Sequence, residues 1–126
     1  MTTFPDYCGL LTRINVIDAV SDWILVSWPN TTYFDYNSSP NSLGLTIFVN
    51  NIQTNNFAPL ETPKIVYGYL ESPVIWDDIA LGYDRSIESR FWHGDIYEVI
   101  IYDRILSFTE FEKVKNYLKE KYAMDF

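Results

Sequence analysis

The sequence is poor in cysteine, histidine and basic residues, and each shortage excludes a class of function. Among 126 residues there is one cysteine, Cys8, and one histidine, His93. A single cysteine forms no internal disulfide and supplies no Cys-x-x-Cys zinc ligands. A single histidine would have to serve every Ser-His-Asp relay and every imidazole metal site. We therefore expect no disulfide scaffold, no catalytic residues and no bound cofactor.

Basic residues are outnumbered by acidic ones, nine against seventeen, which gives a net charge of −8. The imbalance lies entirely in residues 1–105, which hold five basic and thirteen acidic residues, whereas the remainder holds four of each. A surface of this charge repels the phosphate backbone. The charge therefore argues against a nucleic-acid partner.

Long apolar runs are also missing. No stretch approaches the 18 apolar residues of a membrane-spanning helix, and the first residues, MTTFPDYCGLLTR, do not have the pattern of a signal peptide. We expect no membrane insertion. What the chain has in plenty is hydrophobic residues, at 48%, and aromatic residues, at 17%. This composition predicts one packed domain over residues 1–126.

Short apolar runs, each closed by a cluster of Asn, Ser or Pro, dominate the first hundred positions. Such clusters favour turns, and a repeat of about ten residues per strand is typical of a β-sandwich or barrel. The predicted strands lie at residues 13–18, 23–28, 32–36, 45–49, 64–70 and 79–83.

The last predicted strand covers residues 96–102 and is apolar on both faces apart from Glu98. A strand of this kind is usually an interior strand with side chains packed on each side. Glucanase chemistry needs two carboxylates on one face of a strand, but Asp95 and Glu98 are three residues apart and point opposite ways. We therefore predict a structural Glu98 that is hydrogen-bonded to a neighbouring strand, a loop or Arg104.

A helix is predicted over residues 107–121. Ser107 and Glu110 have the spacing of a capping box, and the helix carries acidic residues early and lysines late, as the helix dipole favours. One apolar stripe recurs at helical spacing. We expect the helix to pack through Phe108, Phe111, Val114 and Leu118.

Residues 79–122 resemble the C-terminal part of concanavalin A-like jelly rolls, in particular the laminin G-like group of bacterial and viral proteins. The resemblance rests on a Gly-x-Ile-x-Glu-Val strand, a Tyr-Asp-Arg-x-Leu-Ser-x-x-Glu stretch and a Tyr-Leu-x-x-Lys-Tyr helix. The matching positions are Gly82, Gly94, Ile96, Glu98, Val99, Tyr102, Asp103, Arg104, Leu106, Ser107, Glu110, Tyr117, Leu118, Lys121 and Tyr122.

The resemblance implies an all-β jelly-roll antiparallel β-sandwich, with strands over residues 13–102 and one C-terminal helix. Members of the group are usually longer, so several N-terminal strands are expected to be lacking. Because unpaired sheet edges invite pairing, we expect a homo-oligomer or a place in a larger assembly. The same resemblance suggests an extracellular, virion or surface location.

Aromatic residues next to Asp or Asn are the best functional lead, because Trp and Tyr rings stack on the apolar faces of sugars. Two groups have this pattern, and their members are Trp28, Tyr33, Asp35 and Tyr36 in the first and Trp76 and Asp77 in the second. Aromatic residues in small β domains also commonly belong to the core or to an interface. The acids Asp77, Asp78 and Asp84 could supply oxygen ligands to calcium, although no EF-hand spacing is present.

Two functions fit these observations. The first is a non-catalytic, lectin-like module that binds a glycan or a protein partner. The second is a structural or assembly protein, such as a capsid, decoration or fibre component, that uses the jelly roll as an interface. Trp or Tyr side chains lining an open groove would favour the first, and the short chain and the excess of aromatic residues available for an interface favour the second.

Overall fold

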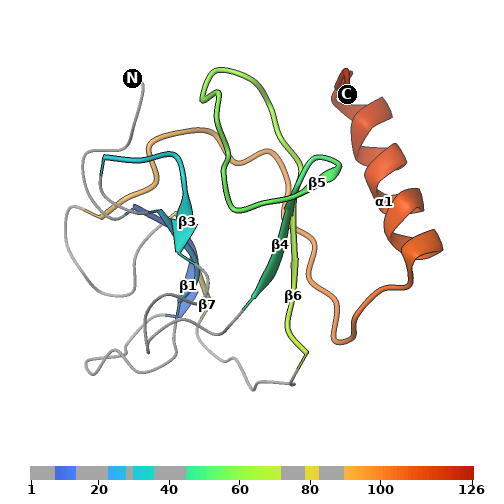
Figure 1. Ribbon diagram of the computed structural model, residues 1–126, viewed down its shortest axis with the longest axis horizontal. Helices are drawn as coiled ribbons and strands as arrows, with labels where there is room; N and C mark the ends of the chain where they lie inside the picture. The colour runs from blue at the N-terminus through green and yellow to red at the C-terminus, as the bar shows by residue number, and fades with distance from the viewer. Residues whose placement is uncertain (1–7, 14–22, 28–29, 36–44, 72–78, 83–89) are drawn as a thin grey trace.

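The structure is a computed structural model that describes residues 8–13, 23–27, 30–35, 45–71, 79–82 and 90–126 (Figure 1). These residues form two antiparallel sheets and one helix. The first sheet has the order β3-β2-β1-β7 and the second the order β5-β4-β6. The bounds are Cys8–Arg13 for β1, Trp23–Ser27 for β2, Phe34–Asp35 for β3, Thr46–Val49 for β4, Ile52–Gln53 for β5, Val66–Tyr69 for β6, Ile79–Leu81 for β7 and Phe108–Lys121 for α1.

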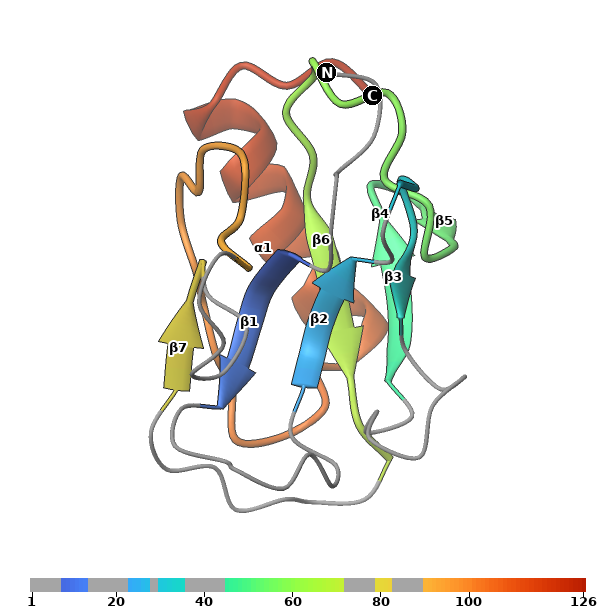
Figure 2. The same cartoon turned by 90° about the vertical axis from the view of Figure 1, so that its left-hand side faces the viewer.

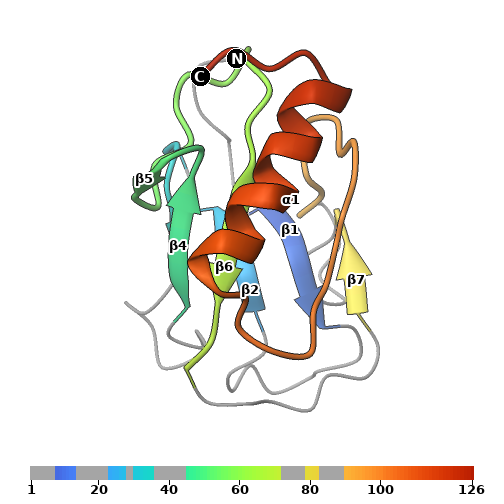
Figure 3. The same cartoon turned by 90° about the vertical axis from the view of Figure 1, so that its right-hand side faces the viewer.

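The elements are arranged in three layers. The first sheet faces the second, and α1 covers the far side of the second sheet (Figure 1). The two side views agree: β7, β1, β2 and β3 lie in front in Figure 2, and α1 lies in front of β6 and β4 in Figure 3. The chain therefore has the two-sheet architecture of a β-sandwich with an added C-terminal helix.

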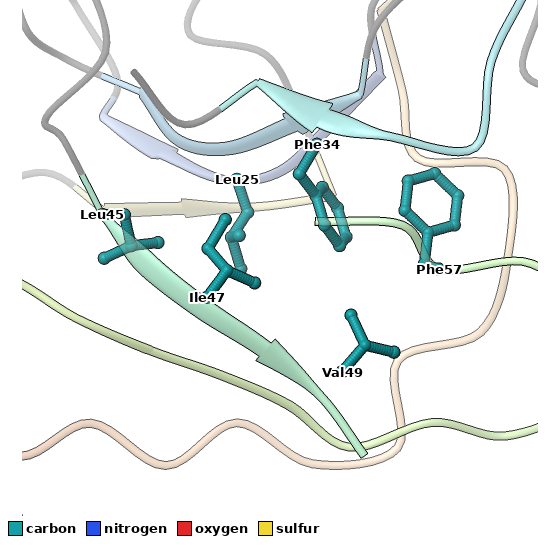
Figure 4. Close-up of a cluster of buried hydrophobic side chains, with 6 residues drawn as sticks. All are labelled: Leu25, Phe34, Leu45, Ile47, Val49 and Phe57. Carbon is teal, nitrogen blue, oxygen red and sulfur yellow. The ribbon is translucent and has the colours of Figure 1, made fainter. Parts of the chain in front are cut away.

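The core lies between the two sheets (Figure 4). Phe34 of β3 is only 1% exposed, and its ring centroid lies 4.5 Å from that of Phe57 and 6.0 Å from that of Trp92. Aliphatic side chains complete the cluster, namely Leu25, Leu45, Ile47 and Val49. Aromatic side chains bury the largest areas, so this group supplies much of the stability of the sandwich.

Strand β4 shows why the sequence forms a sheet here. Ile47 and Val49 are buried while Thr46 and Phe48 are only partly covered, which is the alternation of a strand with one face on the core. Gly68 of β6 lies opposite Ile47, and a Cβ atom at this position would come within 2.8 Å of the Leu45 side chain. The glycine thus allows Leu45 to pack closely over β6.

The helix begins as predicted. The Ser107 hydroxyl accepts a hydrogen bond from the backbone N–H of Glu110, and the Glu110 carboxylate accepts one from the backbone N–H of Ser107. Phe111 stacks on Tyr67 of β6 with ring centroids 4.2 Å apart, and this contact joins the helix to the sheet. The prediction that Phe108 also packs inward was wrong: it is the first residue of the helix, and its side chain is 77% exposed.

Five of the predicted strands are found with shorter bounds, as β2, β3, β4, β6 and β7. The first strand begins at Cys8, earlier than predicted, and residues 14–18 lie outside the described part of the chain. The predicted interior strand over 96–102 was wrong. This segment has no strand assignment and its large side chains are exposed, because none of the described strands pairs with it.

Candidate functional site

The predicted glycan-binding residues are not brought together in the described part of the chain. Trp28, Tyr36, Trp76 and Asp77 lie outside it. The backbone of Asp35 pairs with Val26 of β2. Tyr33 is the candidate whose side chain is described, and it is 45% exposed beside the start of β3.

Tyr33 lies in a polar stretch of backbone that is held firmly. Its backbone forms a β-bridge with Asn56, and the Thr32 hydroxyl donates a hydrogen bond of 2.8 Å to the Asn56 side-chain oxygen. The amide of Asn55 donates to the carbonyl oxygen of Phe34 over 2.7 Å. These bonds fix the loop while the buried Phe34 anchors it, so the phenol of Tyr33 is presented outward from a rigid base.

Acidic and imidazole groups do not cluster. Among the residues that the structure describes, no three His, Cys, Asp or Glu side chains converge as metal ligands would. The calcium candidates Asp77, Asp78 and Asp84 lie outside the described residues. His93 is exposed, at the point where the chain leaves the core at Trp92.

The Glu98 carboxylate is hydrogen-bonded, as predicted, but its partners differ from the predicted ones. They lie at the C-terminal end of the helix and not on a strand, a loop or Arg104. It lies 2.8 Å from the Lys121 ammonium group and accepts a hydrogen bond of 2.8 Å from the Tyr122 hydroxyl. Arg104 instead makes two hydrogen bonds to Glu110, of 2.7 and 2.8 Å.

These contacts shift the ionisation of the groups involved. Hydrogen bonds from Lys121 and Tyr122 lower the pKa of Glu98, while the Glu98 carboxylate raises the pKa of both Lys121 and Tyr122. The Arg104 guanidinium and the Ser107 N–H lower the pKa of Glu110 to about 2. Glu98 is therefore a carboxylate held in its charged form. This form suits an ion pair that joins the chain around residue 98 to the end of the helix, and it does not suit a proton donor.

The most unusual feature of the surface is the stretch 95–102, which we call the exposed segment. Its large apolar and aromatic side chains are each 39 to 59% exposed, and they are Ile96, Tyr97, Val99, Ile100, Ile101 and Tyr102. Isolated apolar residues on a surface need no explanation, but six within seven positions form a patch. Patches of this kind mark interaction sites.

The exposed segment borders a large cavity. The cavity has a volume of about 1240 Å³. Its lining comes from β6, β7, the exposed segment and α1, together with residues 60–65, Leu10 and Leu11 of β1 and the core side chains of Leu25, Phe34, Leu45 and Phe57. Most small-molecule sites hold about 300–1,000 Å³. This space is therefore larger than one small ligand needs.

The backbone around this cavity has polar groups without a sheet partner. Strand β6 pairs with β4 on one edge only, and within the described ranges no strand lies on its other edge. No backbone-to-backbone hydrogen bond joins residues 95–102 to any other described residue. The bond that the backbone of this stretch does receive comes from the Tyr122 hydroxyl to the carbonyl oxygen of Tyr97, at 3.4 Å.

The helix α1, which lines one side of the cavity, is held to the second sheet by a contact that was not predicted from the sequence. Lys115 is 8% exposed, and its ammonium group donates to the side-chain oxygen of Asn51 at 2.7 Å and contacts Glu112 at 2.5 Å. Asn51 belongs to the turn between β4 and β5, so this bond ties the helix to the second sheet. The signal was present, because Lys115 lies in the apolar stripe beside Phe111 and Leu118.

Three comparisons with known proteins add no relative. A scan against protein-family models, a search of curated proteins and a search of solved structures each found no match. Within the described residues, no helix has the length and apolar character needed to cross a membrane.

Proposed function

We propose that this chain is a non-catalytic binding module on a jelly-roll sandwich, and that it binds a protein partner through the exposed segment. The observation that carries the proposal is the row of apolar side chains between Ile96 and Tyr102, left uncovered beside a large cavity. Used in this way, the module is a component of an assembly, as a virion or surface protein would be.

The exposed area is large enough for a specific contact. Since one large side chain can bury about 150–250 Å², the uncovered parts of the six side chains of the exposed segment amount to roughly 500 Å². Tyr117, whose hydroxyl bonds to the Lys121 that holds Glu98, is also exposed and adds to it. A standard interface buries about 800 Å² on each partner. The exposed segment with its surroundings thus provides most of one partner's share.

Site-specific photo-crosslinking tests this proposal. A photoreactive phenylalanine analogue replaces Tyr97 in one variant and Ile52 in another, since Ile52 is an exposed apolar residue on β5 at 66% exposure. In extract of the source organism, we expect one discrete protein adduct from position 97 and none from position 52. Equal labelling from both positions, or none from position 97, would disprove the proposal.

Glycan binding is a second candidate function, supported by one observation. Tyr33 is exposed on a rigid polar loop, next to Thr32 and Asn56, which can hydrogen-bond to sugar hydroxyls. A glycan array with the unaltered chain and a Tyr33→Ala variant tests it. Binding to a defined sugar that the Tyr33→Ala variant loses would establish a lectin-like site on this loop, and binding that the variant retains would exclude Tyr33.

A further inference from the structure

We propose that the occupant of the cavity is an extended β-strand of a different protein, apolar along its length and flanked by basic residues, which inserts between β6 and the exposed segment. The inference rests on the proposed function and names the chemistry of the partner. Three independent features of the cavity support it: its unpaired backbone groups, its size and apolar lining, and the charges at its ends.

The backbone groups come first. Both β6 and the exposed segment border the cavity, and within the described part of the chain neither has a strand partner on that side. Backbone N–H and C=O groups along an unpaired edge present donors and acceptors to an incoming chain. A strand supplies hydrogen-bond partners in the alternating order that an extended backbone requires, whereas a sugar or a helix does not. Strand addition to an open edge is an established mode of peptide recognition.

The lining and the size point the same way. Side chains of Leu10, Tyr67 and Val99 line the cavity from β1, β6 and the exposed segment, and Phe111 and Leu118 line it from the helix. The apolar surroundings on both the sheet side and the helix side fit a strand that is apolar on both faces. The volume of about 1240 Å³ exceeds that of most small-ligand pockets and has room for a short stretch of polypeptide.

Charge distinguishes a different protein from a second copy of this chain. Asp95 and Asp103 lie at the two ends of the apolar run, and neither forms a salt bridge with a described residue. Arg104, which interacts electrostatically with Asp103, is bonded to Glu110 and so leaves the Asp103 carboxylate without a hydrogen-bonded cation among the residues described. If two copies paired their exposed segments in antiparallel fashion about Val99, Asp95 of each would oppose Asp103 of the other. Like charges directly opposite one another destabilise a strand pair. A partner with Lys or Arg at these two positions gains attraction instead, and the net charge of −8 favours its approach.

Backbone hydrogen exchange of the full chain at low concentration is the first test. If the edges are open, the amides of residues 96–102 exchange rapidly, whereas those of Ile47 and Val49, which are buried in a paired strand, exchange slowly. Slow exchange of the 96–102 amides in the isolated monomer would overturn the inference, because it would show that the chain already pairs this segment itself.

Designed peptides then test the occupant. The probe is Lys-Lys-Val-Ile-Val-Ile-Val-Ile-Lys-Lys, and two controls have the same apolar centre, one with Glu in place of each Lys and one with N-methyl groups on alternate residues. We expect the probe to slow exchange at both β6 and the exposed segment, and to bind at least about tenfold more tightly than either control. In the double variant Asp95→Asn and Asp103→Asn, the preference for Lys over Glu should shrink.

The outcomes separate this inference from the proposed function. If the N-methylated peptide binds as tightly as the probe, and Ile101→Asp abolishes the binding of both, the exposed segment binds a partner but not by strand addition. If the probe leaves exchange at β6 and the exposed segment unchanged, strand insertion is excluded, while the crosslink from position 97 still decides the proposed function. A tight symmetric dimer formed through the 96–102 amides would replace the basic-flanked partner with a second copy.

Discussion

Strand β4 and the exposed segment are both rich in Ile, Val and aromatic residues, but β4 packs on the core whereas the exposed segment is accessible to solvent. In β4, Ile47 and Val49 are buried, and the strand is paired on both edges, by β5 and β6. In the exposed segment, Ile100 and Ile101 are 40% and 59% exposed, and no described strand pairs with them. Because the side chains are alike, the difference arises from the backbone partners that each stretch has.

The comparison shows what an apolar pattern means in a β protein. A run of Ile, Val and Tyr requires neighbours on its faces and its edges, but it does not say which chain provides them. For β4 the same chain provides both. For the exposed segment, the helix of the same chain provides a salt bridge between Lys121 and Glu98. Under our proposal, another molecule provides the strand that pairs with it.

The largest expected effect comes from the core side of the comparison. Phe34→Ala removes a ring that contacts Phe57 and Trp92, so it should lower the free energy of unfolding by about 3–5 kcal/mol. Phe108→Ala is the matched control, because Phe108 is 77% exposed, and it should change this free energy by less than about 0.5 kcal/mol. Urea denaturation of both variants measures the difference. Equal losses would show that the first helical turn is buried after all.

The anchor of the helix should give the next largest effect. Lys115→Ala should lower the free energy of unfolding by about 1.5–3 kcal/mol, because it removes a buried ammonium group that is bonded to Asn51 and Glu112 and this is the usual contribution of hydrogen bonds to charged groups. Lys113→Ala, at an exposed position on the same helix, is the control.

A double-mutant cycle with Asn51→Ala tests whether this anchor works through the contact with the turn. Because Lys115 and Asn51 are in direct contact, their effects should not add. Strictly additive losses would mean that Lys115 stabilises the chain by packing along the apolar stripe and not through Asn51.

The sequence predicted those elements that depend on local chemistry. The capping box at Ser107 and Glu110 and the short apolar run at residues 45–49, closed by an Asn turn, are both encoded within a few residues, and they are found as the start of α1 and as β4. The strand at 96–102 was predicted because its residues are apolar on both faces, and this prediction was wrong, because pairing depends on segments far away in the sequence. The bond between Lys115 and Asn51 spans 64 positions and could not be read from spacing.

The candidate site was less predictable than the fold. The aromatic residues were chosen for their neighbours in sequence, and of these only Tyr33 has a described side chain. The exposed apolar row emerged from the structure, because a sequence shows that residues such as Ile100 and Tyr102 are apolar but not whether they are covered. Both Glu98 partners, Lys121 and Tyr122, lie at the C-terminal end of a helix that approaches residue 98 only in three dimensions.

Acid should weaken the contact between Arg104 and the start of the helix at Glu110 in a defined pH range. The folded state lowers the pKa of Glu110 to about 2, below the ordinary value near 4.5. A carboxyl whose pKa is depressed by folding stabilises the folded state above its unfolded pKa, and this contribution is lost as the pH falls toward the folded pKa. We therefore expect stability to be constant from this source above about pH 5 and to fall between about pH 4.5 and 2.

The variant Glu110→Gln isolates that contribution. It cannot ionise, so its unfolding free energy should fall less steeply between about pH 4.5 and 2 than that of the unaltered chain. Glu120→Gln, on the exposed face of the helix near its other end, serves as the control. Identical pH profiles for the unaltered chain and Glu110→Gln would show that the bonds to Arg104 and Ser107 do not persist in solution.

The smallest expected effect is the one that bears most directly on function. Ile47→Val in β4 should cost about 1 kcal/mol of unfolding free energy, because it removes a buried methyl group. Ile101→Val makes the same chemical change in the exposed segment, and in the isolated chain at low concentration it should cost close to nothing. If both substitutions prove equally costly, residues 96–102 are already covered by this chain and no partner is needed. If Ile101→Val becomes costly only when a strand is bound, the apolar row stabilises the complex and not the monomer, as expected of a surface that serves as half of an interface.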